Sequence, residues 1–107
     1  MQELPATGTL GTAEKMLFQC PRDQIAEIRI RLTETANATA AVTLTMTPTR
    51  GGKEVNLLYP GKSMTAQETL NIPSDAGVIM LGPGTRIDGL AGSGAVDYVI
   101  HGRTYPA

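Results

Sequence analysis

The chain has 107 residues and nearly balanced charge, with 9 Lys and Arg against 10 Asp and Glu. This length predicts one domain, and the scattered basic residues offer nucleic-acid phosphates no continuous field. Aromatic residues make up 4% and Trp is absent, which argues against a base-stacking platform. No apolar run approaches the ~20 residues of a membrane helix and no signal-peptide pattern is present, so we expect a soluble protein made in the cytoplasm.

The first 13 residues, MQELPATGTLGTA, are polar, contain glycine and follow no clear period. Chain ends of this kind are commonly poorly ordered. We therefore expect residues 1–13 to form a flexible arm and residues 14–107 to form a single domain.

Alternation of apolar and polar residues is the clearest pattern after the arm. It predicts a strand over Gln24–Thr33 and a second strand over Thr39–Thr47, each with one buried and one polar face. The polar segment ETANA between them suits a hairpin connection. The predicted polar faces comprise Glu27, Arg29, Arg31 and Thr33 in the first strand and Thr43, Thr45 and Thr47 in the second.

Glycine and proline turns divide the rest of the chain into further short strands. The last two are separated by Gly92-Ser93-Gly94 and are expected to pair as a hairpin. About eight strands without a convincing amphipathic helix predict an all-β, single antiparallel β-sandwich, either a jelly roll or immunoglobulin-like. The further strands are expected over Lys15–Cys20, Lys53–Tyr59, Ser63–Ile72, Gly77–Leu81, Thr85–Ala91 and Ala95–Gly102.

Residues able to carry chemistry are few. His101 is the sole histidine, whereas a transition-metal site needs several imidazole or carboxylate ligands. Cys20 is the sole cysteine, so it can form neither an intrachain disulfide nor a thiolate cluster, and we expect it to be packed. Asp88 and Asp97 fall in the expected closing hairpin. A glycosidase would need such a pair facing one cleft, but aromatic sugar platforms are lacking, so we expect both carboxylates to be solvated.

Three short motifs have ordinary explanations. Leu81–Thr85, LGPGT, lacks the Gly-Lys-Ser/Thr ending and the helix of a phosphate-binding loop, so it predicts a turn. Asn37-Ala38-Thr39 matches the glycosylation triplet, which is uninformative without a secretion signal. The serines, Ser63, Ser74 and Ser93, lie in no nucleophile-elbow context. We therefore expect no enzyme and no catalytic, cofactor-binding or metal-ligating residue.

Four pieces of the chain, taken in order, resemble the pattern of small phage virion proteins. The pieces are KMLFQCP, IAEIRIRLTETANATAAVTLTM, PGKSMTAQETLNI and GPGTRIDGLAGSGAVDYVIHG. The closing strand of that pattern ends as Ile100-His101-Gly102 does here. The resemblance covers Lys15–Arg103, and Cys20 and the turn at Arg22-Asp23-Gln24 are not diagnostic of the group. Its motifs consist of core and turn positions, so it implies no contact residues.

The resemblance implies a role in binding. Proteins of this kind are β-sandwiches that decorate and cement a capsid or form part of a tail or fibre, commonly as homotrimers. We therefore expect a bacteriophage virion structural protein that binds the major capsid protein or another virion protein, with neither nucleic acid nor membrane as a partner. The alternative is a tail or fibre component that acts as a carbohydrate- or receptor-binding module.

Overall fold

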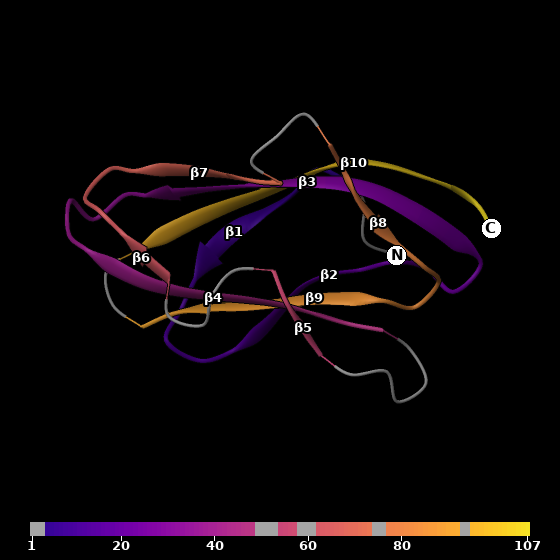
Figure 1. Ribbon diagram of the computed structural model, residues 1–107, viewed down its shortest axis with the longest axis horizontal. Helices are drawn as coiled ribbons and strands as arrows, with labels where there is room; N and C mark the ends of the chain where they lie inside the picture. Colours follow the sequence, from indigo (N-terminus) through magenta and orange to yellow (C-terminus); the bar gives the residue numbers. More distant parts are fainter. Residues whose placement is uncertain (1–3, 49–53, 58–61, 74–76, 93–94) are drawn as a thin grey trace.

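The structure is a computed structural model that describes residues 4–48, 54–57, 62–73, 77–92 and 95–107. Within these ranges the chain forms ten strands and no helix. The described residues therefore contain no helix that is long and apolar enough to cross a membrane. The strands form two antiparallel sheets that pack face to face (Figure 1). The molecule measures 41 × 26 × 25 Å.

The first sheet, sheet A, is built around two long strands that pair along their whole lengths, β3 (Gln24–Glu34) and β10 (Val96–Pro106). β1 (Ala6–Leu10) pairs with the other edge of β10. β7 (Thr69–Ile72) and β8 (Ile79–Leu81) pair with separate parts of β3. One edge of sheet A is therefore a strand in two pieces.

The second sheet, sheet B, has β4 (Ala40–Thr47) and β9 (Arg86–Ala91) at its centre. β2 (Lys15–Gln19) pairs with β9, with a shift in register between Met16 and Phe18. β5 (Val55–Asn56) and β6 (Lys62–Met64) pair with separate parts of β4. Sheet B thus also has one edge made of two short strands.

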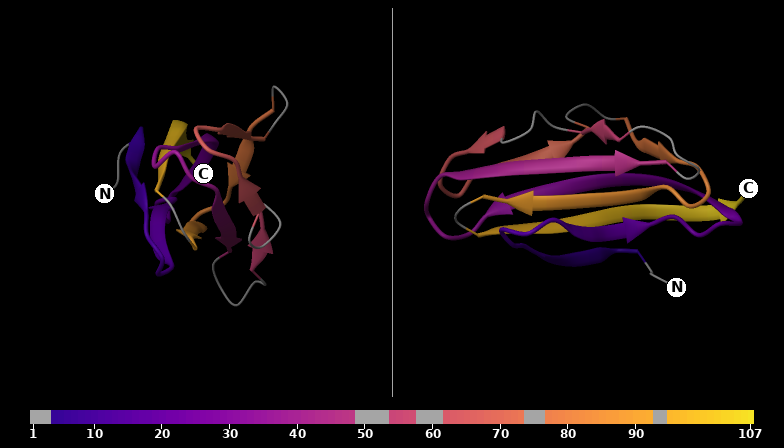
Figure 2. Two further views of the ribbon diagram at one scale, coloured as in Figure 1. Left: turned by 90° about the vertical axis from the view of Figure 1, so that its left-hand side faces the viewer. Right: turned by 90° about the horizontal axis from the view of Figure 1, so that it is seen from below.

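The strand order identifies the topology. Sheet A runs β1-β10-β3-β7, with β8 also on β3, and sheet B runs β2-β9-β4-β5, with β6 also on β4. Counting each two-piece edge as one interrupted strand gives eight strands in two sheets of four. Most connections cross from one sheet to the other. The crossings can be followed in the view along the long axis and in the view from below (Figure 2, left and right). This arrangement is a jelly roll. The predicted antiparallel β-sandwich is confirmed. Of the two predicted topologies, the jelly roll is the one that forms.

The core forms where the inner faces of the two sheets meet. Every second residue of β3, from Ala26 to Leu32, is at most 1% exposed, as the alternation predicts. Burying an aliphatic side chain of this size stabilises the fold by about 1.5–3 kcal/mol, so the paired inner faces hold the sheets together. The largest apolar side chains in the core are Phe18, Leu17, Ile28, Ile30, Leu32, Leu44, Met64, Leu81, Ile87 and Ile100.

The expected flexible arm is wrong for residues 6–10, which form β1. Thr7 and Thr9 are exposed and Leu10 is buried, so the segment does alternate. Gly8 hides the pattern, because it lies opposite Tyr98 and a Cβ there would come within 2.8 Å of the Tyr98 hydroxyl. A side chain at position 8 would therefore crowd the Tyr98 ring, and glycine stands where an apolar side chain would have revealed a strand.

Both expected hairpins are wrong. β3 and β4 belong to opposite sheets, and so do β9 and β10. A two-residue period is the same whether the next strand pairs alongside or crosses to the facing sheet, so the sequence pattern did not distinguish the two cases. Of the expected turns, residues 51–52, 60–61 and 93–94 lie outside the described residues.

The single strand expected over Ser63–Ile72 is wrong as well, because it divides into β6 in sheet B and β7 in sheet A. The chain changes sheet in a turn at Thr65–Glu68. There the Thr65 amide donates to the Glu68 carboxylate at 2.8 Å, and the Glu68 amide donates back to the Thr65 carbonyl at 3.1 Å. Gln67 has φ 61°, a left-handed conformation that a regular strand does not contain.

Candidate interaction surface

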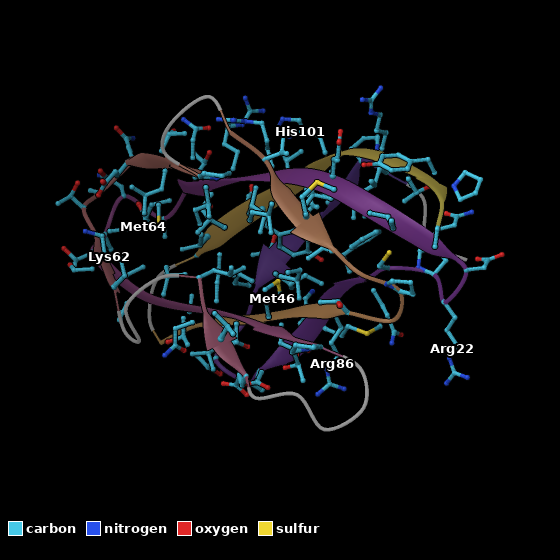
Figure 3. The ribbon with its side chains drawn as sticks, turned by 45° about the vertical axis from the view of Figure 1, so that its right-hand side comes forward. Arg22, Met46, Lys62, Met64, Arg86 and His101 are labelled. Atoms are coloured by element: carbon cyan, nitrogen blue, oxygen red, sulfur yellow. The ribbon has the colours of Figure 1, made fainter. Side chains whose placement is uncertain are left out.

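The outward-facing side chains of β3 and β10 form a charged surface on sheet A. Arg29 and Arg31 alternate with buried residues of β3, and Arg31 is exposed. His101 lies directly opposite Arg29, and Arg103 lies opposite Glu27. His101 is exposed, and Figure 3 shows it on the opposite side of the sandwich from Arg86 of sheet B. We call the outward-facing residues of β3, β8 and β10 the sheet A surface.

A small hydrogen-bond network ties Glu27 to β10. Arg103 Nε lies 3.2 Å from Glu27 Oε2, and the Tyr105 hydroxyl donates to Glu27 Oε1 at 2.9 Å. The bond from Tyr105, followed by that from Arg103, lowers the pKa of Glu27. The same bond raises the pKa of Tyr105, because losing its proton would break it. Glu27 is therefore a carboxylate at neutral pH whose charge is balanced by Arg103.

Arg29 connects the sheet A surface to the edge of the sheet. Its guanidinium donates to the carbonyl of Gly77 and to the carbonyl of Pro73, the latter at 3.3 Å. These two carbonyls flank the connection between β7 and β8, so one cation holds the ends of both edge pieces. The Arg29 guanidinium is consequently held in position on the surface.

A hollow of about 230 Å³ opens on the sheet A surface. Gly102 lies at its wall with φ +150°, and a Cβ there would come within 1.9 Å of the Glu27 carbonyl oxygen. Only glycine fits such a position, and Gly102 contributes backbone alone to the lining of the hollow. Val78, 46% exposed, contributes an apolar wall. The lining comprises Glu27, Ile28, Arg29, Val78, His101, Gly102 and Arg103.

The two aspartates considered as a carboxylate pair lie in opposite sheets. Asp88 of β9 is 5% exposed, and its Oδ2 lies 3.0 Å from Arg86 Nε. Asp97 of β10 accepts a hydrogen bond from the Thr9 hydroxyl at 2.7 Å. The prediction of adjacent carboxylates is wrong because β9 and β10 do not pair, and Asp88 is buried rather than solvated.

Cys20 and the Leu81–Thr85 turn pack against each other. The Cys20 thiol donates to the Gln24 carbonyl at 3.2 Å, and burial raises its pKa. The Cys20 amide donates to the Thr85 carbonyl at 2.8 Å, and the Gly84 amide donates to the Cys20 carbonyl at 3.0 Å. Cys20 is therefore packed, as predicted, and LGPGT is a turn that closes the end of the sandwich.

The threonine face of β4, which the sequence predicts to be polar and open to water or to a partner, is less exposed than expected. Thr45 is 3% exposed, and its hydroxyl is buried without a hydrogen-bond partner among the described residues. Thr43 and Thr47 are half-buried. A buried hydroxyl without a partner carries a desolvation cost, which marks Thr45 as a locally unfavourable position.

Glu34 is a buried carboxylate that the sequence analysis missed. It is 1% exposed and accepts hydrogen bonds from the amides of Gln67 at 2.9 Å, Ala36 at 2.8 Å and Ala38 at 3.2 Å. These hydrogen bonds lower the pKa of Glu34, and the bond from Gln67 has the largest effect. Glu34 thereby ties the β3–β4 loop to the β6–β7 turn. Its inward place in the alternation, two residues after Leu32, is the signal that could have revealed it.

The remaining motif residues that the structure describes lie at the surface. Asn37 of the glycosylation triplet has φ 55° in the β3–β4 loop, a conformation that Asn adopts more readily than most residues. Ser63 is exposed in β6, and residues 74 and 93 lie outside the described residues. Within the described ranges, His, Cys, Asp and Glu side chains do not gather in threes at any point.

No protein-family model matches the chain, and no curated protein matches it. Among solved structures, it is similar to the Drosophila melanogaster CENP-C cupin domain, with a TM-score of 0.41 and 11% identity over 96% of this chain and 64% of that one. It is also similar to structures of infectious bursal disease virus. The Gx strain structure has a TM-score of 0.40 and 9% identity, and the match covers 96% of this chain and 30% of that chain. The Gt strain structure has a TM-score of 0.33 and 8% identity, and the match covers 95% of this chain and 32% of that chain. The chain thus spans less than two thirds of each, and the jelly-roll assignment rests on the strand order.

Proposed function

We propose that the protein is a non-enzymatic bacteriophage virion structural protein, a decoration protein that binds the major capsid protein and stabilises the head. The observation that carries the proposal is the eight-strand jelly roll with aliphatic side chains between its sheets. Jelly rolls recur in viral capsid proteins, lectins and cupins. The resemblance of Lys15–Arg103 to small phage virion proteins favours the viral member of this group.

The placement of the polar groups supports binding over catalysis. Cupin-like metal chemistry needs imidazole and carboxylate ligands converging on one point. The sole histidine, His101, lies on the sheet A surface, and the carboxylate of Glu34 is occupied by backbone amides. We therefore propose that the protein acts through its surface, without a cofactor or metal.

The aromatic residues make a sugar-binding role on a tail or fibre the weaker alternative. Sugar sites stack exposed rings against the ligand. Here Phe18 is fully buried and Tyr98 is 6% exposed. Tyr105 is half-buried and uses its hydroxyl on Glu27. These described rings therefore form no open stacking platform.

The dimensions fit a protein that docks on a larger assembly. A face with edges of 41 and 26 Å has an area on the order of 1,000 Å², whereas a standard stable interface buries about 800 Å² from each partner. One broad face is therefore sufficient for docking. We further propose that three copies associate, because linked copies gain avidity on a symmetric particle, and that the protein is located in the virion.

Immunogold electron microscopy of gradient-purified phage particles, with antibody against the recombinant protein, tests the proposed role. Label on the heads is expected. Label on tails or fibres would support the alternative, and particles without the protein would overturn the virion role. Light scattering at micromolar concentration tests the trimer, for which three times the 11.3 kDa chain mass is expected. A mass of 11.3 kDa would contradict a trimer in solution.

A further inference from the structure

We propose that the hollow on the sheet A surface is the docking contact of this protein, and that its occupant is an acidic segment of the major capsid protein that inserts one apolar side chain. The inference rests on the proposed function and names the surface and the chemistry through which that function operates.

The size of the hollow indicates the kind of occupant. Small-molecule and cofactor sites are clefts of about 300–1,000 Å³, and this hollow has about 230 Å³. It is thus better matched to a single side chain than to a cofactor. Anchoring of a partner by one side chain in a desolvated pocket is common at the centre of protein interfaces.

Exposed apolar side chains gather beside the hollow. Val78 lines it and is 46% exposed. Met80, two residues further along the same edge, is 51% exposed and lies opposite Glu27 in the register. Such side chains at the rim of a concavity gain from being covered by a partner, so the apolar part of the occupant has a matching wall.

The charges around the hollow select an acidic partner. Arg29, Arg31 and Arg103 lie on this surface, and Glu27 is already balanced by Arg103 and Tyr105. Arginine recognises carboxylates through a planar fork of donors. Asp97 lies further along β10, opposite Thr33. The lining of the hollow itself carries two arginines, Arg29 and Arg103, against one carboxylate, Glu27, so positive charge is in excess at the hollow.

The hollow is built on rigid parts of the fold. β3 and β10 pair over eleven residues, and Gly102 is paired with Ile28 beside the hollow. Arg29 is held by two backbone carbonyls. A partner therefore meets groups that are already in place, which reduces the conformational entropy lost on binding.

The test is rebinding of purified protein to phage particles made without this gene, measured as protein retained after sedimentation over a range of concentrations. Val78→Asp places a charge in the wall of the hollow. Val55→Asp is the matched control, because Val55 is also 46% exposed but lies on the edge of sheet B. We expect Val78→Asp to bind about tenfold or more weakly and Val55→Asp to bind like the unmodified chain. Circular dichroism and thermal midpoints verify that both variants fold.

The charge component has its own variant. Arg31→Glu reverses an exposed charge on the same surface. We expect this variant to rebind more weakly than the unmodified chain, and we expect the deficit to be larger at low salt than at high salt. Attraction between exposed charges is screened by salt, so the difference between the two chains should shrink as NaCl rises. Equal rebinding of the two chains at low salt would contradict an acidic occupant.

The outcomes separate this inference from the proposed function. If the unmodified chain is not retained on the particles, the decoration role fails. If it is retained and Val78→Asp binds equally well, the role stands and the docking surface is wrong. If only Val55→Asp loses binding, the docking surface is on sheet B.

Photocrosslinking in assembled particles gives an independent answer if Val78→Asp does not fold. Benzoylphenylalanine at position 78 should crosslink to the major capsid protein, and the same residue at position 55 should not. A crosslink from position 78 to a second copy of this chain would overturn the capsid protein as the occupant.

Discussion

Sheets A and B start from the same sequence pattern and end with different outer faces. Among the outward residues of β3 in sheet A, Arg31 is exposed, and Glu27, Arg29 and Thr33 are half-buried. In sheet B the outward residues Thr45 and Asp88, which lie opposite each other, are only 3% and 5% exposed. Alternation therefore identifies the two faces of a strand but does not reveal how deeply the polar face is covered.

The difference has consequences for energetics. Polar groups on the sheet A surface keep access to water, so their contribution to folding is small and they are available for a partner. Polar groups on sheet B must find partners within the protein or pay a desolvation cost. Asp88 has Arg86, whereas the Thr45 hydroxyl has no partner among the described residues.

The largest contrast is expected between two glycines. Gly102→Ala in sheet A places a Cβ 1.9 Å from the Glu27 carbonyl oxygen at φ +150°, and relief requires the β3–β10 pairing to move. We expect a loss of about 3 kcal/mol or more in unfolding free energy. Gly89→Ala in sheet B meets the ends of the Leu44 and Leu17 side chains at 2.7 and 3.1 Å, which can rotate, so about 1–2 kcal/mol is expected. Urea unfolding measures both, and a larger loss for Gly89→Ala would contradict this account.

Acid should act through β3 of sheet A. The pKa of Glu34 is lowered in the folded state, so its stabilisation is present above its ordinary value near 4.5 and is lost as pH falls through the folded pKa. We expect Glu34→Gln to unfold at lower urea at pH 7 and to show a flatter decline below pH 4.5 than the unmodified chain. Glu27→Gln, whose carboxylate bonds to side chains at the surface, should change less. An unchanged pH profile in Glu34→Gln would remove Glu34 as the cause.

The two ion pairs should differ in the same direction as the two faces. Arg86→Met leaves the carboxylate of Asp88, with a side chain 7% exposed, without its cation, and we expect a loss of about 1–3 kcal/mol in unfolding free energy. Arg103→Met removes an arginine with a side chain 76% exposed. Exposed pairs contribute little, so its urea midpoint should match that of the unmodified chain. Equal losses would show that the two faces are equally covered.

The smallest expected effect is a gain. Thr45→Val replaces the buried hydroxyl that lacks a partner with a methyl group of similar shape, and we expect stabilisation of about 1 kcal/mol. Thr33→Val, at a half-buried outward position of β3, is the matched change in sheet A and should be close to neutral. Denaturant midpoints decide the comparison, and a destabilised Thr45→Val would indicate that the hydroxyl has a partner.

Much of the fold follows from the sequence alone. The alternation over Gln24–Thr33 and Thr39–Thr47 predicts β3 and β4 to within a residue, because burying one face of a pleated strand requires a period of two. Its inward positions form the core. The same alternation, continued one step to Glu34, also contains the buried carboxylate, although a charged residue at the end of a strand is more often solvated.

The partners of each strand were decided by tertiary structure. β9 and β10 carry the same period whether they form a hairpin or face each other across the core, and only packing of all the apolar faces selects the second arrangement. That selection separates Asp88 from Asp97 and brings Cys20 to the turn at Leu81–Thr85. The hollow arises in the same way. Glycine between His101 and Arg103 is unremarkable in the sequence, and it becomes necessary only because β3 lies 1.9 Å from where its side chain would begin.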